Sequence, residues 1–374
     1  MKGEGIREYL RYMVEEKKIP YIDFMLCKGD KIIYRFLDGA EKAPTGKENL
    51  FLWSMTKPLT VACVMKLCEE GRLALSDEVE KYLPAYKTVF LLDENGNRRA
   101  PKRKMTVKHL LTMTAGLSYN TATEPIRRVR KETDGKADTL AFVNAFAEEP
   151  LLFDPGEQFQ YSLCHDVLGA IVEVVSGKRF SKYMQETLFA PLQMQKTGFH
   201  LEHRLDIAKQ YTCDTEQNIY PDEGNNHLIL GENYESGGAG AIGNVEEYAR
   251  FARMLARGGI ADDGSRILKA ETIKEMSAEQ QSSFIMNNNF SCVQGTDYGY
   301  GLGVRVRLKE TEWGLPKGEF GWDGAAGSYL MVDTENEISV VIGMHLRCWP
   351  FIISGDHLEL VKRGYEELKA DGLF

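Results

Sequence analysis

The sequence has no cysteine arrangement that would form a disulfide framework or a common zinc site. Its 374 residues include seven cysteines, an odd number, and none of them stands in a C-x-x-C pair. We therefore expect free thiols in a reducing compartment, which predicts a cytoplasmic protein. His200 and His203, followed by Asp206, could ligate zinc, but they have no further partner at a recognised spacing. We predict no metal and no cofactor.

Long apolar stretches and an excess of positive charge are also lacking. No apolar run is long enough to span a bilayer, and the first residues lack the layout of a signal peptide, although a signal removed earlier is compatible with this. The formal net charge of −9 disfavours nucleic acid and anionic membranes as partners. The basic runs 98–108 and 127–131 lie among turn-forming or acidic residues and indicate solvated loops. A small molecule is the expected partner, and nothing indicates an oligomeric state.

The beginning and the end of the chain have different patterns from the middle. Residues 1–20 predict an amphipathic helix, and a hairpin follows over residues 21–36, turning at Lys28-Gly29-Asp30. Residues 58–70 are apolar nearly all round and stop at Gly71, which predicts a buried helix. Near the end, four segments read as strands and one as a closing helix: 300–306, 318–322, 329–333, 338–345 and 356–368.

The middle of the chain is mainly helical in pattern, with predicted helices at 106–111, 138–147 and 166–175. A glycine-rich stretch at 236–243 then precedes a helix that begins with a capping box of Asn244 and Glu247. A chain of this length favours two packed units. We predict an α/β (α+β) fold in which an antiparallel sheet, flanked by N- and C-terminal helices, is formed by residues 1–75 and 236–374. Residues 76–235 would form an inserted, mainly helical domain.

One serine in the chain is followed three positions later by lysine, in Ser54-Met55-Thr56-Lys57. Both residues stand where the buried helix begins, with Pro58 in its first turn. Residues three apart on a helix face the same way, so the Lys57 amine can reach the Ser54 hydroxyl and accept its proton. The Ser54 backbone N–H, free at a helix start, can help to hold an oxyanion. The motif alone also fits a helix-capping serine beside a solvated lysine.

The sequence around this motif resembles class C β-lactamases and their esterase and D-alanyl-peptidase relatives, in the β-lactamase and penicillin-binding-protein superfamily. The resemblance runs in order along nearly the whole chain. The matching segments are Phe51-Leu52-Trp53-Ser54-Met55-Thr56-Lys57, His109-Leu110-Leu111-Thr112-Met113-Thr114-Ala115-Gly116-Leu117, Phe159-Gln160-Tyr161-Ser162, Ser236-Gly237-Gly238-Ala239-Gly240 and Gly321-Trp322-Asp323-Gly324-Ala325. It implies the β-lactamase/transpeptidase-like fold and a serine mechanism.

By this resemblance, Tyr161 matches the tyrosine of the second motif, which shares proton handling with the lysine. We expect a lysine ammonium nearby to pull the pKa of the phenol down. The backbone N–H of Ala325 would be the second oxyanion donor, and Gly324 would let a substrate approach the strand closely. Sequence does not decide whether Lys57 or Tyr161 is the base in acylation.

Two departures from the β-lactamase pattern bear on the substrate. Tyr161-Ser162-Leu163 stands where those enzymes have Tyr-x-Asn, so an amide is replaced by an apolar group. Trp322-Asp323-Gly324 replaces Lys-Thr-Gly, so the cation that grips a substrate carboxylate is missing. Losing a charge-assisted contact of about 1.5–3 kcal/mol weakens recognition of a carboxylate roughly tenfold to a hundredfold. Arg347 could anchor a carboxylate from another direction.

The Trp-x-Gly form resembles the esterase and acyltransferase branch, and we take Trp322, Asp323 and Gly324 as substrate-binding residues. The prediction is a serine hydrolase that acts on carboxylic esters, or an amide, through an acyl-enzyme on Ser54. A β-lactamase or D-alanyl peptidase is the nearest alternative, and a catalytically silent binding module is another. A thiol hydrolase using Cys164 and His165 is disfavoured, because adjacent residues point apart.

Overall fold

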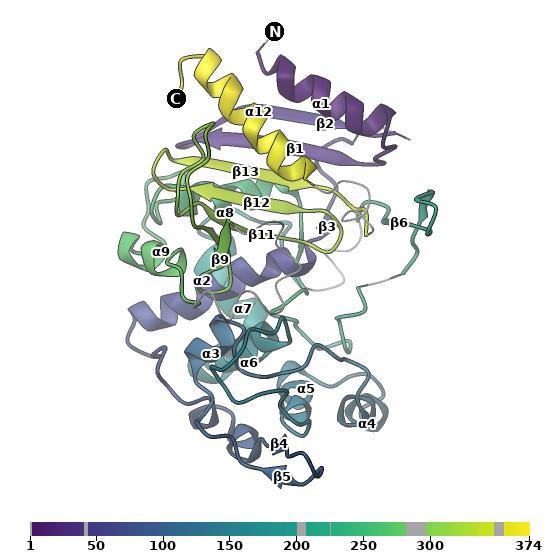
Figure 1. Cartoon of the computed structure of the whole chain (residues 1–374), viewed down its shortest axis with the longest axis vertical. Helices are drawn as coiled ribbons and strands as arrows, with labels where there is room; N and C mark the ends of the chain where they lie inside the picture. The colour runs from purple at the N-terminus through teal and green to yellow at the C-terminus, as the bar shows by residue number, and fades with distance from the viewer. Residues whose placement is uncertain (1, 41–43, 200–206, 225, 282–296, 348–354) are drawn as a thin grey trace.

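An antiparallel sheet forms the centre of the computed structural model, which describes residues 2–40, 44–199, 207–224, 226–281, 297–347 and 355–374. Within these ranges the sheet has seven strands, in the order β2-β1-β13-β12-β11-β10-β9 (Figure 1). Their bounds are β1 (Ile22–Lys28), β2 (Lys31–Asp38), β9 (Tyr298–Tyr300), β10 (Arg305–Arg307), β11 (Phe320–Asp323), β12 (Tyr329–Asp333) and β13 (Ile338–Gly343). The two ends of the chain therefore share one sheet, as predicted.

Helices cover both faces of this sheet. The terminal helices α1 (Glu4–Glu15) and α12 (Asp356–Ala370) lie side by side on one face (Figure 1). The apolar stripe expected on the first helix is the part of α1 that is buried, against strand side chains such as Phe24 and Ile342. Helix α8 (Val245–Ala256) packs against β1, β12 and β13.

The middle of the chain supplies a second, mainly helical region (Figure 1). Its helices are α3 (Val107–Leu111), α4 (Glu124–Glu132), α5 (Thr139–Phe146), α6 (Cys164–Ser176) and α7 (Phe180–Met184). The remaining elements are α9 (Ala270–Met276), the 3-10 turns η2 (Val79–Lys81) and η3 (Pro84–Thr88), the π turn η4 (Gln185–Phe189), and the short strands β3 (Leu50–Phe51), β4 (Leu91–Leu92), β5 (Arg98–Arg99), β6 (Tyr211–Cys213), β7 (Ile219–Pro221) and β8 (Ile242–Gly243). The predicted fold class is confirmed, while the domain boundaries stay a prediction.

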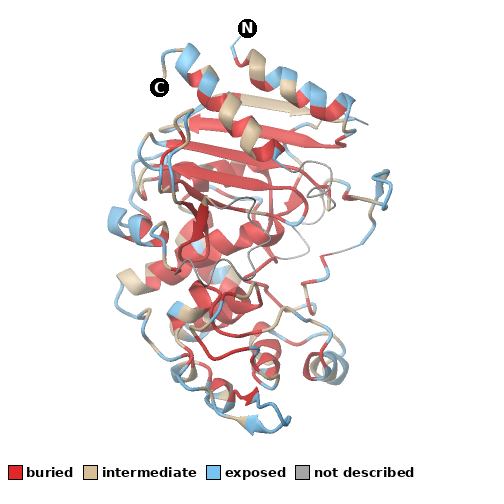
Figure 2. Ribbon diagram, in the orientation of Figure 1, coloured by how far each residue is buried: buried red, intermediate tan, exposed pale blue. Residues whose placement is uncertain are grey.

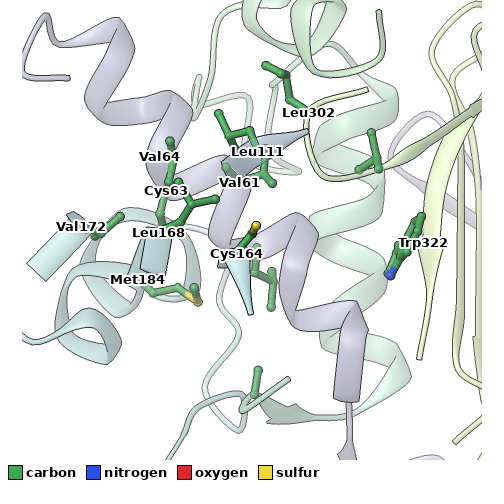
Figure 3. Packing of buried hydrophobic residues seen from close by; sticks show 14 of the residues in the cluster. Val61, Cys63, Val64, Leu111, Cys164, Leu168, Val172, Met184, Leu302 and Trp322 are labelled. Carbon is green, nitrogen blue, oxygen red and sulfur yellow. The ribbon is translucent and has the colours of Figure 1, made fainter. Parts of the chain in front are cut away.

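Helix α2 (Thr56–Glu69) is the element that both regions bury. Every residue from Thr56 to Met65 is buried, so this helix has no solvent-facing stripe over most of its length (Figure 2). It packs against α6 in the helical region and against β11 of the sheet. Figure 3 shows the α2 side chains Val61, Cys63 and Val64 within the larger core cluster. The cluster also includes Leu168 and Val172 of α6 and Met184 of α7. The start of α2 is thereby held between the two regions.

Three local predictions were wrong. The basic run 127–131, expected in a solvated loop, lies in α4, because Pro125 favours a helix start and Ile126 is buried in the core. Residues 300–306 form two strands, because Gly303, with φ +70°, turns the chain between β9 and β10. The capping box of α8 is only half formed. Asn244 accepts the Glu247 N–H at 2.9 Å, but the Glu247 carboxylate binds Lys196 N–H and the Thr197 hydroxyl instead. Within the described ranges, no helix is long and apolar enough to cross a bilayer.

Candidate active site

Ser54 lies in η1 (Trp53–Met55), a 3-10 turn directly before α2, and its side chain is almost fully buried. The preceding residue, Trp53, has φ +49°, a conformation that costs a non-glycine residue about 1–3 kcal/mol. Three side chains hold the Trp53 ring in place. Its Nε1 donates to Gln210 Oε1 at 3.2 Å, the Arg347 guanidinium lies 5.3 Å from its centroid, and His227 packs beside it. This strained turn is where the nucleophile was predicted.

Two proton-handling groups reach the Ser54 hydroxyl. Lys57 Nζ lies 3.0 Å from Ser54 Oγ, and the Tyr161 hydroxyl donates to the same oxygen at 2.7 Å. Lys57 is completely buried, and its Nζ also lies 4.6 Å from the centroid of the Tyr161 ring. The structure thus brings Tyr161, which is distant in the sequence, to Ser54 and Lys57, at distances suited to proton transfer.

The glycine-rich loop at 236–241 fixes Lys57 from the other side. Lys57 Nζ donates to Gly238 O at 2.8 Å, and the Thr60 hydroxyl, one turn further along α2, donates to Gly237 O at 2.6 Å. A Cβ atom on Gly237 would lie 2.2 Å from the His165 carbonyl oxygen, and one on Gly238 would lie 2.7 Å from an Asp166 carboxylate oxygen. Both positions require glycine because the loop packs tightly on α6.

Asp166 anchors this loop from α6. Its carboxylate accepts the Tyr234 and Ser236 hydroxyls, each at 2.6 Å, and is almost fully buried. Burial raises the pKa of Asp166, while these two hydrogen bonds and the charge of Lys57 lower it. Asp166 therefore supplies a buried acidic group behind the lysine.

Tyr161 lies within a series of packed aromatic rings. Its ring stacks on Trp322 with centroids 5.7 Å apart and tilts against Tyr119 at 5.3 Å, and Trp322 Nε1 donates to the Tyr161 hydroxyl at 3.3 Å. Burial raises the pKa of Tyr161 well above its ordinary value, and the bonds to Ser54 and Trp322 only partly oppose this. The expectation of a lowered pKa was wrong, because desolvation of the phenolate outweighs the hydrogen bonds that favour its charged form.

Trp322-Asp323-Gly324, the third motif of the family resemblance, ends strand β11 and leads into the turn to β12. Gly324 N donates to Ser328 O at 2.7 Å, which places Ala325 at the exposed tip of this turn. A Cβ atom on Gly324 would lie 2.7 Å from Leu52 O, so this glycine lets the turn pack against the residues that lead to Ser54. The roles of the Ser54 and Ala325 N–H groups as oxyanion donors stay predictions.

The other predicted residues lie as follows. Trp322 and Gly324 border the Ser54 site, while the Asp323 carboxylate accepts from Arg305 Nη1 at 2.8 Å. Leu163 is buried and lines a separate cavity of about 20 Å³ together with Leu117 and Ile126. Burial raises the pKa of the Cys164 thiol to about 12, which disfavours a thiolate there. Residues 200–206, which include His200, His203 and Asp206, lie outside the described residues.

Sequence reasoning missed several supporting residues. The strained backbone of Trp53, the Gly238 carbonyl and the Asp166 carboxylate each complete the surroundings of Ser54 and Lys57. Asp166 stands five positions after Tyr161, and an acidic residue directly before an apolar run, 167–172, is the signal that could have revealed it.

A buried serine contacted by a lysine amine and a tyrosine hydroxyl, between an antiparallel sheet and a helical region, defines a serine hydrolase-type enzyme. The model of the family described as Beta-lactamase matches residues 6–347. The chain belongs to this family.

The similarity to known relatives also extends over most of the chain. The chain is 29% identical over 329 residues to Protein Rv1367c of Mycobacterium tuberculosis, covering 84% of this chain and 81% of that protein. It is 27% identical over 284 residues to Acyltransferase mokF of Monascus pilosus, covering 70% and 67%. The solved structure of EstCE1, described as a hydrolase with promiscuous acyltransferase activity, has a TM-score of 0.79 at 24% identity, covering 97% of this chain and 98% of that one. This last likeness shows the shared fold.

Proposed function

We propose that the protein is a carboxylic ester hydrolase whose acyl-enzyme on Ser54 can also transfer its acyl group to an alcohol. The observation that carries this proposal is the double contact to Ser54 Oγ, by Lys57 Nζ at 3.0 Å and the Tyr161 hydroxyl at 2.7 Å. The acyltransferase name of the Monascus pilosus relative and the description of EstCE1 support the same reaction class.

The reaction proceeds in two halves. The Ser54 oxygen attacks the ester carbonyl and passes its proton to Lys57, which must carry a neutral amine to accept it. The Tyr161 phenol, kept protonated by burial, then donates toward the departing alcohol oxygen as the C–O bond breaks. Lys57 returns a proton to the Tyr161 oxygen, and water or a second alcohol attacks the acyl-enzyme by the same steps reversed.

An uncharged ester is favoured over a β-lactam for two reasons. Trp322 presents an indole where the β-lactamase pattern has a lysine, so a substrate carboxylate finds no cation at this position. Leu163, at the position of the second-motif amide, is buried toward Leu117 and Ile126. A cytoplasmic location remains part of the proposal, and the free thiols Cys27, Cys63 and Cys164 support it.

The test is hydrolysis of p-nitrophenyl butyrate by the wild type, by Ser54→Ala and by Ser265→Ala, a control in an exposed loop. We expect activity in the wild type and the control, and at least a thousandfold loss in Ser54→Ala. A fluorophosphonate probe should label Ser54, as read by mass spectrometry of the peptide. Adding 1-butanol and measuring butyl butyrate separates acyl transfer from hydrolysis. Hydrolysis of a chromogenic cephalosporin without any ester turnover would reverse the substrate assignment.

A further inference from the structure

A buried arginine connects three strands directly behind the third motif. Arg305, on β10, donates from Nη1 to Asp323 Oδ1 at 2.8 Å and from Nη2 to Leu330 O at 2.7 Å. Its side chain is only 3% exposed, and its guanidinium lies 4.3 Å from the centroid of the Tyr329 ring. Arg305 thus binds β11 at its last residue and β12 at the opposite side of the same hairpin.

The strand next to Arg305 leaves room for this side chain because the residue at position 321 is glycine. Gly321 pairs with Arg305 across the strands, and a Cβ atom there would lie 3.1 Å from Arg305 Nη2 and 1.9 Å from Leu330 O. A side chain at position 321 would therefore obstruct the bond between Arg305 and Leu330. The first glycine of the Gly-Trp-Asp-Gly segment, Gly321, is therefore required because the Arg305 side chain passes across it.

The contact with Asp323 lies on the face of the sheet opposite to the reacting groups. Successive strand residues point to opposite faces, and Trp322 points toward the Tyr161 hydroxyl. Asp323 pairs across the hairpin with Tyr329, which packs in the cluster beneath α1 and α12 and against His357. The ion pair can therefore act on the site through the backbone next to Asp323, which carries Trp322 before it and Gly324 and Ala325 after it.

Two features of the Gly324–Ala325 backbone bear on how firmly it is held. It ends a strand at the tip of a turn, where Ala325 is exposed, and it packs closely on Leu52 O, two residues before Ser54. An ion pair that is buried and also bonded to a neighbouring strand restricts the strand end more than exposed contacts do. Electrostatic stabilisation of an oxyanion depends on donors that are fixed before the reaction.

We propose that the Arg305–Asp323 ion pair positions the Gly324–Ala325 backbone for oxyanion stabilisation in the reaction of Ser54, with Arg305 as a positioning residue. This rests on the proposed function, in which Ser54 forms an acyl-enzyme. Asp323 then serves the third motif as the anchor for Arg305, and contact with the substrate belongs to Trp322 and to the backbone after it.

The test is a double-mutant cycle on kcat with p-nitrophenyl butyrate. The variants are Arg305→Met, Asp323→Ala and the double variant, and Asp323→Asn keeps an oxygen that can accept from Arg305. Arg253→Met is the control, because the Arg253 side chain, on α8, is also nearly buried and pairs with a carboxylate, that of the exposed Asp262. All proteins are assayed at one temperature, about 20 °C below the lowest midpoint of thermal unfolding among them, so that neither loss of folded protein nor temperature alters the comparison of kcat.

Complete removal of one oxyanion donor lowers kcat by about a hundredfold to a thousandfold, and displacement should lower it less. We expect about tenfold to a hundredfold lower kcat in Arg305→Met and Asp323→Ala, with KM changed less than about threefold. Arg305→Met also removes the bond to Leu330 O and the buried ion pair with Glu319, so the double variant should be no worse than Arg305→Met alone. Asp323→Asn and Arg253→Met should stay within about threefold of wild type.

Three results would overturn the proposal. Folded Arg305→Met or Asp323→Ala with wild-type kcat would show that the pair does not act on the site, as would a control that loses as much activity. If the fold loss of kcat in the double variant equals the product of the two single losses, the two residues act independently. If Arg305→Met does not fold, Asp323→Ala, at a strand end with a 20% exposed side chain, decides alone. A wild type that neither turns over esters nor labels at Ser54 refutes the proposed function instead.

Discussion

Replacing Tyr161 by Phe separates catalysis from stability at this site. The substitution removes a single oxygen, which donates to Ser54 Oγ at 2.7 Å and accepts from Trp322 Nε1 at 3.3 Å. The ring stays, so its stacking on Trp322 and its contact with Tyr119 are kept. Positioned acid–base groups contribute about a hundredfold to ten-thousandfold in rate, or roughly 2.7–5.4 kcal/mol of transition-state stabilisation. We expect kcat/KM to fall by that amount.

The free energy of unfolding should change far less. An internal hydrogen bond contributes about 0.5–1.5 kcal/mol net, and the variant no longer buries a hydroxyl. We therefore expect Tyr161→Phe to lose at most about 1.5 kcal/mol in urea unfolding. Tyr119→Phe is the matched control, since it removes a hydroxyl from the adjacent ring, and it should keep kcat/KM within about threefold.

Steady-state hydrolysis of p-nitrophenyl butyrate and urea unfolding on the same preparations make the comparison. Retention of more than a tenth of wild-type kcat/KM in Tyr161→Phe would refute its role in proton transfer. A loss above about 3 kcal/mol in stability would show instead that the hydroxyl is structural.

Three further changes test other parts of the structure. Gly324→Ala places a Cβ 2.7 Å from Leu52 O, so kcat should fall at least tenfold while Ser54 stays in place; unchanged kcat would contradict this close packing. Asp154→Asn should cost about 1 kcal/mol in urea unfolding at pH 7. Hydrogen bonds from Arg99 lower the pKa of Asp154 to about 2, so the difference should disappear as pH falls from 4 to 2, and a constant difference would exclude the ion pair as its cause. His165→Leu should raise stability, because neither imidazole nitrogen has a hydrogen-bond partner among the described residues. Burial and then the Lys57 charge lower the pKa of His165, so protonation favours the unfolded chain below about pH 6.5; the gain should be larger at pH 5 than at pH 8, and an equal or negative change would contradict this.

Two kinds of information in the sequence predicted different parts of the site. The spacing of Ser54 and Lys57 is local, because a helix start places residues three apart on one side, and the structure has them 3.0 Å apart. Tyr161 and Trp322 came only from the resemblance to a family, since nothing local relates positions 54, 161 and 322. Packing of α2 between α6 and β11 brings them together.

The sequence by itself determined the fold class and most of the elements that form the sheet and the helices that cover it. Periodic apolar positions predicted α1 and the terminal strands, since burial of one face depends mainly on local spacing, and a segment apolar nearly all round predicted α2. Tertiary structure alone decided the direction of the Tyr161 pKa, the bond of Asp323 to Arg305 and the support of Lys57 by Gly238. Each of these depends on desolvation or on contact between segments distant in the sequence, and neither can be read from the neighbours of a residue along the chain.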